Sequence, residues 1–378
     1  MVTAAGGSAE LEEEAMLSVE MMPAGRGDAV LVEYGPSNTA TNRLLIDGGP
    51  VNSGLYDGIR ARLAQIPVDE HGCRRLDLLI VTHIDTDHVE GVIRLLQDDE
   101  LALRFDDIWF NGWEHVSQIQ DGDRPNVLGG LQGEFLGALL TEHDLPWNRA
   151  FGGGPVFMVD DLRLPQRALA GGMALTILSP NVKKLHDLAD EWSEAVKDAG
   201  FVPGASDKVR AALAGKWWAR PHVLGDSATR RRSKDNSKAN GSSIAVMAEY
   251  GGRSVLLAGD AHFDIMTTSL RQLQLDRGTT EPLHVDAYKI PHHGSRKNLS
   301  EQMLATIDPR HYLVSTNGKR FSHPDPDAIK QLRDRHRGER LPVFCFNYDV
   351  DTTEKYRGRP GLEARYGPDA IVRLSTDD

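Results

Sequence analysis

The chain has 378 residues, and its 55 acidic side chains outnumber its 43 lysines and arginines, which gives a formal charge of −12. A hydrophobic fraction of 40% is sufficient for a sizeable core, and it excludes a chain that is disordered along its whole length. No apolar stretch approaches the about 20 residues that a membrane-spanning helix needs. The acidic balance argues against a protein that coats nucleic acid, although it is compatible with an enzyme that has a local basic groove.

Cysteine usage and the first residues indicate the compartment. Cys73 and Cys345 are the two cysteines, too few for a disulfide framework or a zinc knuckle. Acidic residues, Glu10 and then Glu12 to Glu14, stand where a signal peptide would need a basic start and an apolar run. We therefore expect a cytoplasmic protein with no membrane partner. A homo-oligomer is compatible with the sequence, and no protein partner is indicated.

The organisation along the chain follows from shifts in composition. Residues 1–17 are small and acidic and are expected to form a flexible arm. A single domain is expected over residues 18–350, interrupted by an insertion at about 181–240. Residues 351–378 are expected to be a C-terminal extension.

Short apolar and β-branched runs predict the strands of this domain. In chain order they lie at residues 29–34, 43–47, 78–81, 107–110, 173–178, 243–250, 254–258, 287–290, 312–315 and 343–346. Helical spacing of apolar residues is found at 89–96 and again at 185–196. Strands that alternate with helices and hairpins predict a layered α/β protein.

The insertion allows two interpretations. It opens with the helical pattern at 185–196 and becomes basic at Arg230–Lys234. Such a charge run is typical of a solvated loop, and the alternative is a lid that steers substrate. Trp217 and Trp218 are typical of helix packing, and alternatively they could form the walls of a pocket.

The chemistry-bearing residues gather directly after the continuous apolar run 78–81. Four potential metal ligands stand within six residues there, namely His83, Asp85, Asp87 and His88. Buried charges must be paired or bound to metal, so a purely structural role explains this cluster poorly. Alternate residues of an extended loop project the same way, and His88 then turns aside. This pattern predicts one metal held by His83 and Asp85 and another held by Asp87 and His88.

Further ligands are expected from the second half of the chain. Asp260 follows the apolar run 254–258 and Gly259, where its two oxygens could bridge two cations; alone, such an aspartate is more often a turn-former or helix cap. His292 and His293 follow another strand, and neighbouring side chains point apart. One of the two histidines is therefore expected to ligate a metal, and the other to contact substrate or donate a proton. We favour His292 as the ligand.

The run from His83 to His88 resembles the metal-binding motif His-x-His-x-Asp-His of the metallo-β-lactamase superfamily. The form with aspartate at the second position resembles the branch that contains the hydrolase domain of the DNA-uptake protein ComEC. Other segments match that branch in order, at residues 24–29, 45–49, 240–261, 290–295, 315–317 and 322–324. The resemblance covers about residues 20 to 335. It implies an αββα sandwich, in which two mixed sheets are flanked by helices, with a helical and loop insertion.

The resemblance also implies two divalent metal ions, Zn²⁺ or Mn²⁺. Their expected ligands are His83, Asp85, Asp87, His88, Asp260 and His292. Because an aspartate replaces the second histidine, oxygen-rich coordination makes a harder cation such as Mn²⁺ more plausible. Two positions depart from the motif. Glu90 replaces the first glycine after it, and the superfamily's third histidine has no clear counterpart, with His115 as the one candidate.

The implied activity is metal-dependent hydrolysis by a water activated between two cations. Asp87 is expected to orient the water, and His293 or His323 to protonate the leaving group. Ser295, Asn317 and His323 are expected to contact substrate, although His323 could instead simply open a helix. A phosphodiesterase or nuclease acting on nucleic acid is favoured. A small-molecule ester or nucleotide hydrolase is one alternative, and a metal-binding sensor with little catalysis is another.

Overall fold

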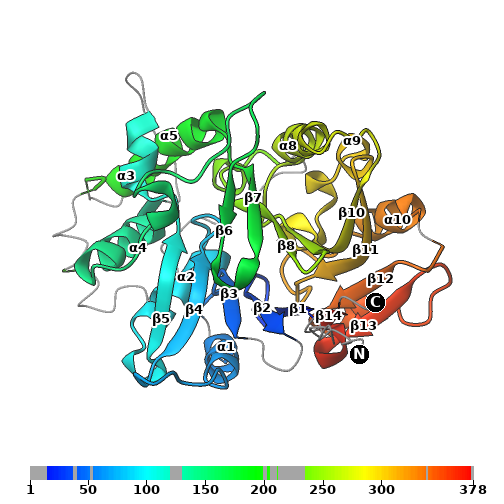
Figure 1. Ribbon diagram of the computed structural model, residues 1–378, viewed down its shortest axis with the longest axis horizontal. Helices are drawn as coiled ribbons and strands as arrows, with labels where there is room; N and C mark the ends of the chain where they lie inside the picture. The colour runs from blue at the N-terminus through cyan, green and yellow to red at the C-terminus, as the bar shows by residue number, and fades with distance from the viewer. Residues whose placement is uncertain are drawn as a thin grey trace, which may run out of the picture.

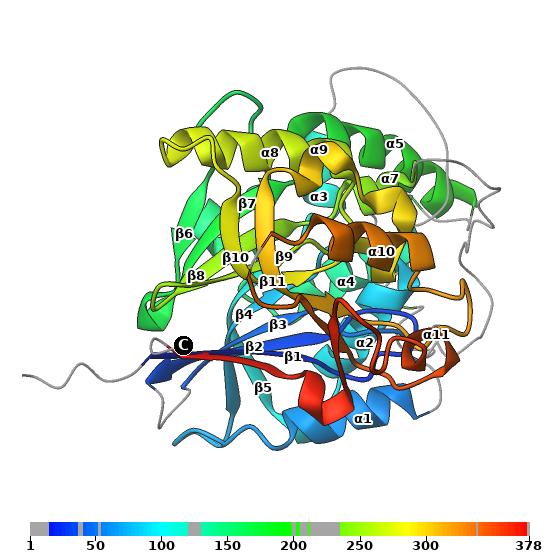
Figure 2. The ribbon, with the colours of Figure 1, turned by 90° about the vertical axis from the view of Figure 1, so that its right-hand side faces the viewer.

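A computed structural model describes residues 15–36, 41–51, 54–119, 130–198, 202–204, 211, 235–337 and 339–375. Two mixed β-sheets lie face to face, and helices cover the outer side of each (Figures 1 and 2). Apolar side chains from the inner faces of the two sheets form one core. A second core lies between the first sheet and its helices, and a third lies between the second sheet and its helices. The expected αββα sandwich is confirmed.

The first sheet has the strand order β14-β1-β2-β3-β4-β5. Its strands are β1 (Ala15–Met21), β2 (Val30–Pro36), β3 (Asn42–Ile46), β4 (Arg74–Ile80), β5 (Leu103–Trp109) and β14 (Val372–Ser375). The first three strands pair antiparallel, whereas β3, β4 and β5 run parallel. Parallel pairing requires crossover connections, and helices α1 (Leu55–Leu63) and α2 (Thr86–Leu96) supply them.

The second sheet has the order β13-β12-β11-β10-β9-β8-β7-β6. Its strands are β6 (Gln166–Ala168), β7 (Ala174–Ser179), β8 (Ala245–Tyr250), β9 (Arg253–Leu257), β10 (Leu283–Lys289), β11 (Ile307–Val314), β12 (Val343–Phe346) and β13 (Glu363–Tyr366). Pairing is antiparallel from β6 to β9 and parallel from β9 to β13.

The remaining helices cover the sheets or connect them. They are α3 (Trp113–Val116), α4 (Gly130–Glu142), α5 (Val182–Asp198), α7 (Lys238–Gly241), α8 (Phe263–Asp276), α9 (Glu301–Leu304), α10 (Pro326–Arg335) and α11 (Asp351–Glu354). Short 3₁₀ turns lie at Asp99–Leu101, Ser117–Ile119, Arg149–Phe151, Ala170–Gly172, Pro291–Gly294, Arg296–Asn298 and Gly367–Ala370. Helices α1 and α2 pack on the first sheet, α4 packs against α2, and α5 packs against α4, whereas α8, α9 and α10 pack on the second sheet.

All ten predicted strands are found in the structure, with shifted ends, but both chain ends differ from the expectation. Strand β1 begins at Ala15, inside the range expected for the flexible arm, and residues 1–14 lie outside the described part of the chain. Strands β13 and β14 lie inside the expected C-terminal extension and join one sheet each. Strand β14 pairs directly with β1, so the two ends of the described chain meet at one edge of the first sheet.

The insertion is described in part. Helix α5 opens it, as the spacing predicts, while residues 199–201, 205–210 and 212–234 lie outside the described residues. Trp217, Trp218 and the basic run Arg230–Lys234 therefore also lie outside them. Among the described helices, none is long and apolar enough to cross a membrane.

Candidate metal centre

The loops that carry the predicted ligands meet at one edge of the sandwich. The run from His83 to His88 connects β4 of the first sheet to α2, while Asp260 and His293 follow β9 and β10 of the second sheet. These strands belong to the parallel parts of their sheets, whose carboxyl ends gather functional loops. Side chains separated by more than 200 positions in the sequence are thereby brought into contact.

Two overlapping groups of side chains have ligand atoms close enough to share an ion. One is His83, His88 and Asp260, and the other is Asp87, His88 and His293. The Nε2 atom of His88 lies 3.6 Å from Oδ2 of Asp260, and Nε2 of His293 lies 3.9 Å from the same oxygen. Metal–ligand bonds of about 2.0–2.2 Å place neighbouring ligand atoms about 3 to 4 Å apart, so this spacing fits a cation.

Asp85 and Asp87 border these groups. Oδ2 of Asp85 lies 3.7 Å from Nε2 of His83, and Oδ2 of Asp87 lies 4.0 Å from Nε2 of His293. Asp85 precedes α2 and is more exposed than the histidines, whereas Asp87 lies in the first turn of that helix. Carboxylates at the start of a helix are stabilised by its dipole, which favours both as anionic ligands.

Buried nitrogen atoms mark this cluster as a candidate cation site. Nε2 of His83 and Nε2 of His88 are buried and have no hydrogen-bond partner among the described residues. Leaving such an atom without a partner costs free energy, and a metal ion removes that cost. Although burial disfavours the imidazolium, the carboxylates of Asp260 and Asp47 hold the pKa of His88 well above its usual range. The negative field that binds a proton there also suits a divalent cation.

Asp47 orients both histidines of the first half. Its Oδ2 lies 2.7 Å from Nδ1 of His88 and accepts a hydrogen bond of 2.7 Å from the Thr82 hydroxyl. That hydroxyl lies 2.9 Å from Nδ1 of His83, so one carboxylate fixes two imidazole rings. Such support raises the basicity of metal-binding histidines. From the sequence, Asp47 was expected to end a strand, and no role at the site was predicted for it.

The two consecutive histidines are placed differently from the expectation. His293, and not His292, joins the groups of ligand atoms found among the described residues. The backbone explains this difference, since both residues adopt a left-handed conformation, with φ of 49° for His292 and 56° for His293. That turn directs His293 inward, where its Nδ1 lies 3.0 Å from the Ser315 carbonyl oxygen. Left-handed non-glycine residues cost of order 1–3 kcal/mol each, a strain that clusters at functional sites.

His292 lies beside the cluster. Its Nδ1 is 3.1 Å from Oδ2 of Asp235, which also accepts hydrogen bonds from Asn240 and Asn298. His323 is close by, with its ring centre 6.0 Å from that of His292 and its Nδ1 3.4 Å from Asp325. Sequence reasoning missed Asp235, because it stands in a polar run with no motif around it. Burial lowers the pKa of His323.

Glycines allow the loops to close around α2. A Cβ atom on Gly27 would lie 1.8 Å from the Asp87 carbonyl oxygen, and one on Gly91 would lie 1.8 Å from the Gly48 carbonyl oxygen. Glu90, the departure from the motif, directs its carboxylate to the backbone N–H of Val51, which donates a hydrogen bond of 3.2 Å. The close approach thus requires a glycine at position 91, and position 90 tolerates a side chain.

Three other predicted residues are engaged elsewhere. His115 accepts a hydrogen bond from the Gly112 N–H and contacts the Gly153 carbonyl oxygen, so it lies outside the cluster and supplies no third histidine. The hydroxyl of Ser295 accepts a hydrogen bond from the backbone of the 3₁₀ turn that follows it. The backbone N–H of Asn317 donates to the Gly25 carbonyl oxygen, which places Asn317 beside the first loop of the site.

No family model matches the chain. In sequence the chain is similar to ComE operon protein 3 of Bacillus subtilis (strain 168), with 27% identity over 154 residues that cover 39% of this chain and 17% of that protein. In structure it is similar to the short form of human tRNase Z, with 11% identity, 96% of this chain and 99% of that chain covered, and a TM-score of 0.37. It is also similar to CmlA, a diiron β-hydroxylase from Streptomyces venezuelae, with 15% identity, 96% and 54% covered, and a TM-score of 0.37. At such TM-scores the fold rests on the strand order itself, and the resemblance to the metallo-β-lactamase superfamily rests on the ligand motif from His83 to His88.

Proposed function

We propose that the chain is a metal-dependent hydrolase with a dinuclear centre, and that it cleaves phosphodiester bonds as a nuclease. One observation carries the proposal: histidines and carboxylates from both sheets converge, and two of the buried ring nitrogens have no hydrogen-bond partner in the part of the chain that the structure describes. One cation would be held by His83 and Asp85 and the other by Asp87, His88 and His293. Asp260 lies close to His83 as well as to His88 and His293, so its carboxylate would supply ligand oxygens beside both sets.

Different residues of the chain would have different roles in hydrolysis. When bound, two divalent cations supply Lewis acidity and lower the pKa of a water molecule. Asp87 would accept a hydrogen bond from the attacking water and orient it. His292 and His323 each have Nδ1 beside a carboxylate. The Nε2 atom of either ring would therefore be available to donate a proton to the leaving oxygen. Asp47 holds His88 in place throughout and touches no substrate.

Positive charge beside the centre favours an anionic substrate. Nε of Arg26 lies 3.6 Å from Oδ2 of Asp87, and its guanidinium also donates to the Thr86 hydroxyl. Arg320 lies near this pair, and its guanidinium interacts electrostatically with both Arg26 and Asp87. Guanidinium groups match the geometry of phosphate oxygens, and here they lie within an acidic protein. This local positive charge supports a phosphodiester over a neutral ester as the substrate.

The experiment measures bound metal and hydrolysis together. The purified chain is analysed for metal and is then assayed with Mn²⁺, Zn²⁺ or Mg²⁺ on bis-p-nitrophenyl phosphate and on labelled single-stranded DNA. We expect cleavage that requires metal, and a loss of at least about 100-fold in Asp260→Ala and His88→Ala. His71→Ala is the matched control, because His71 is exposed and precedes the start of β4, whereas the ligand run follows the end of that strand.

Each result decides between functions. Cleavage of DNA supports a nuclease, and cleavage of the small ester alone supports a small-molecule phosphodiesterase. About two metals per chain without hydrolysis of either substrate would contradict the phosphodiesterase and leave a sensor or another hydrolase. A chain that binds no metal under any condition would overturn the metal centre itself.

A further inference from the structure

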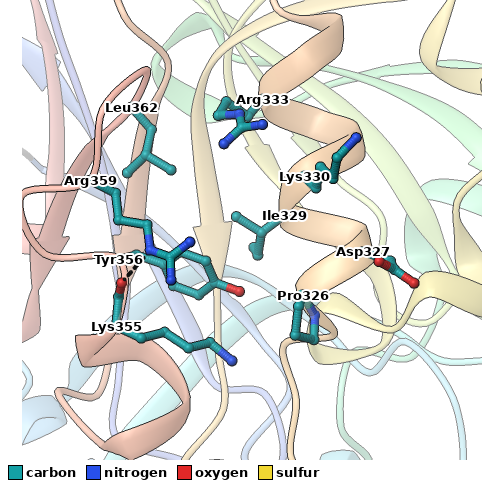
Figure 3. A pocket seen from close by; sticks show the side chains of 9 residues that line it. All are labelled: Pro326, Asp327, Ile329, Lys330, Arg333, Lys355, Tyr356, Arg359 and Leu362. Atoms are coloured by element: carbon teal, nitrogen blue, oxygen red, sulfur yellow. Dashed lines mark hydrogen bonds between the residues drawn. The ribbon is translucent and has the colours of Figure 1, made fainter.

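A cavity of about 470 Å³ lies outside the metal centre, between helix α10 and the segment that follows α11. Figure 3 shows side chains from both elements directed into it. None of its lining residues is among the predicted or observed metal ligands. Its chemistry is therefore independent of the proposed hydrolysis.

Positive charge dominates the lining. Lys330 and Arg333 come from α10, and Lys355 and Arg359 come from the facing segment, whereas Asp327 is the single carboxylate in the lining. Lys330 and Arg333 share one partner outside it, Asp334, at 2.9 Å and 2.6 Å. Within the described chain, Lys355 and Arg359 form no ion pair. Because the protein as a whole has a charge of −12, this local excess of positive side chains favours the binding of an anion in the cavity.

A buried hydroxyl supplies the second, independent observation. Tyr356 is only 5% exposed, yet its hydroxyl has no hydrogen-bond partner among the described residues. Figure 3 shows this hydroxyl directed across the cavity toward α10. Burial raises the pKa of Tyr356 to about 12, so the group is a donor at neutral pH. A buried donor without an acceptor is rare in folded proteins, and a ligand oxygen would satisfy it.

The rest of the lining is apolar. Ile329 and Leu362 face each other across the cavity from α10 and from the segment before β13. We propose that this cavity binds a small organic phosphate. Its phosphate oxygens would be held by Lys355, Arg359 and the Tyr356 hydroxyl, and its apolar group would pack on Ile329 and Leu362. A phosphate fits better than a carboxylate, because three donors from separate side chains call for three acceptor oxygens.

Phenylphosphonate is the probe, since its carbon–phosphorus bond resists hydrolysis. Calorimetric titration of the full chain is performed with metal bound and again after chelation. We expect one site per chain that survives chelation, which separates it from binding at metal. Inorganic phosphate, which lacks the apolar group, should bind that site at least about threefold more weakly.

Substitutions in the cavity lining test whether phenylphosphonate binds there. Arg359→Gln and Tyr356→Phe should each weaken phenylphosphonate binding by about 5- to 10-fold, the effect of one hydrogen bond to a charged group. Arg271→Gln is the matched control, because Arg271 is exposed on α8 and does not line the cavity. Tyr356→Phe removes a hydroxyl for which the described residues provide no hydrogen-bond partner, so the Tm of the unliganded chain should not fall. Loss of binding at unchanged Tm is a result that a merely structural tyrosine would not give.

Two sources could supply the phosphate, a free metabolite or the end of a nucleic acid. A 5′-phosphorylated oligothymidylate and its unphosphorylated counterpart compete with the probe on the chelated chain. Displacement by the phosphorylated strand alone would identify a nucleic-acid end as the source, and displacement by neither would identify a free organic phosphate. No binding at millimolar phenylphosphonate after chelation would overturn the proposal. Binding that Arg359→Gln and Tyr356→Phe both leave unchanged would overturn it as well.

Discussion

The positions of single side chains at the centre are set by residues that would never touch a metal. Asp47 is fully buried and holds Nδ1 of His88 at 2.7 Å and, through Thr82, Nδ1 of His83. Asp47→Asn keeps the shape of the side chain and removes its charge. We expect metal affinity to fall about 10- to 100-fold, as for other supporting carboxylates. Competition with a chromogenic chelator measures this affinity.

Loss of a buried carboxylate could act through the fold alone, and Asp286→Asn separates the two effects. Asp286 is also buried, and its Oδ2 accepts a hydrogen bond of 2.8 Å from the backbone of Ser254, away from the ligands. Both variants should lose stability, but only Asp47→Asn should lose metal affinity. Equal metal affinity in the two variants would contradict the role given to Asp47.

The ligand cluster could be predicted at the residue scale where a local pattern carried it, as in the run from His83 to His88 and at Asp260 after an apolar strand. The run from His83 to His88 is contiguous, so spacing alone indicated its chemistry. The choice between His292 and His293 depends on two left-handed backbone residues, and sequence patterns do not show which way such a turn directs a side chain. Asp235 reaches His292 from a distant loop, and it carries no sequence signal.

At the scale of elements, the close packing of the first loop on α2 depends on a missing side chain. A Cβ atom on Gly27 would overlap the Asp87 carbonyl oxygen, whereas one on Gly58, inside α1, would meet nothing within 4 Å. Gly27→Ala should therefore destabilise the chain by more than about 2 kcal/mol and displace Asp87. Gly58→Ala should instead stabilise it by about 0.5–1 kcal/mol. Urea denaturation measures both, and equal effects would contradict the close approach.

Glu134 connects helix α4 to α5 and makes that contact sensitive to pH. Its carboxyl group accepts hydrogen bonds from Nε1 of Trp192 and from the Gly204 N–H, and burial raises its pKa to about 7. A carboxyl group whose pKa is raised on folding binds its proton more tightly in the native state. Its contribution is thus greatest below the unfolded pKa near 4.5 and is lost as the pH rises to about 7.

Glu134→Gln removes this titration while keeping the acceptor oxygen. The free energy of unfolding of the parent chain should fall by on the order of 3 kcal/mol more than that of the variant between pH 4.5 and pH 8. Denaturant titrations at several pH values measure this difference. Parallel pH profiles for the two chains would show that Glu134 does not titrate in this range.

The elements themselves were largely predictable, and the exceptions have one cause. Interior strands such as β4 and β9 end in continuous apolar runs, because both faces of these segments are buried. Strands β1 and β14 alternate apolar and polar residues beside acidic or terminal sequence, so their patterns are weak. Their pairing depends on the meeting of the two chain ends, a long-range contact that no local pattern contains.

At the scale of the whole molecule, one buried ion pair connects the two sheets beside the centre. Lys289 ends β10 of the second sheet, and its Nζ lies 2.6 Å from Oδ2 of Asp28, in the loop that joins β1 to β2 of the first. Although burial favours the neutral acid, the Lys289 ammonium group holds the pKa of Asp28 well below its usual range. Oδ1 of Asp28 lies 3.5 Å from Nδ1 of His293, so the pair also borders the ligand cluster.

Removing one partner leaves the other charge buried and alone. Lys289→Met should therefore cost about 3–5 kcal/mol of unfolding free energy, and Asp28→Asn should cost a comparable amount. The double variant leaves no uncompensated charge, so its loss should be well below the sum of the two single losses. Arg335→Met, which breaks an exposed pair with Glu301, should change stability by less than about 1 kcal/mol. Additive losses in the double variant would mean that the two sheets are held together without this pair, and that apolar packing alone brings the halves of the metal centre into register.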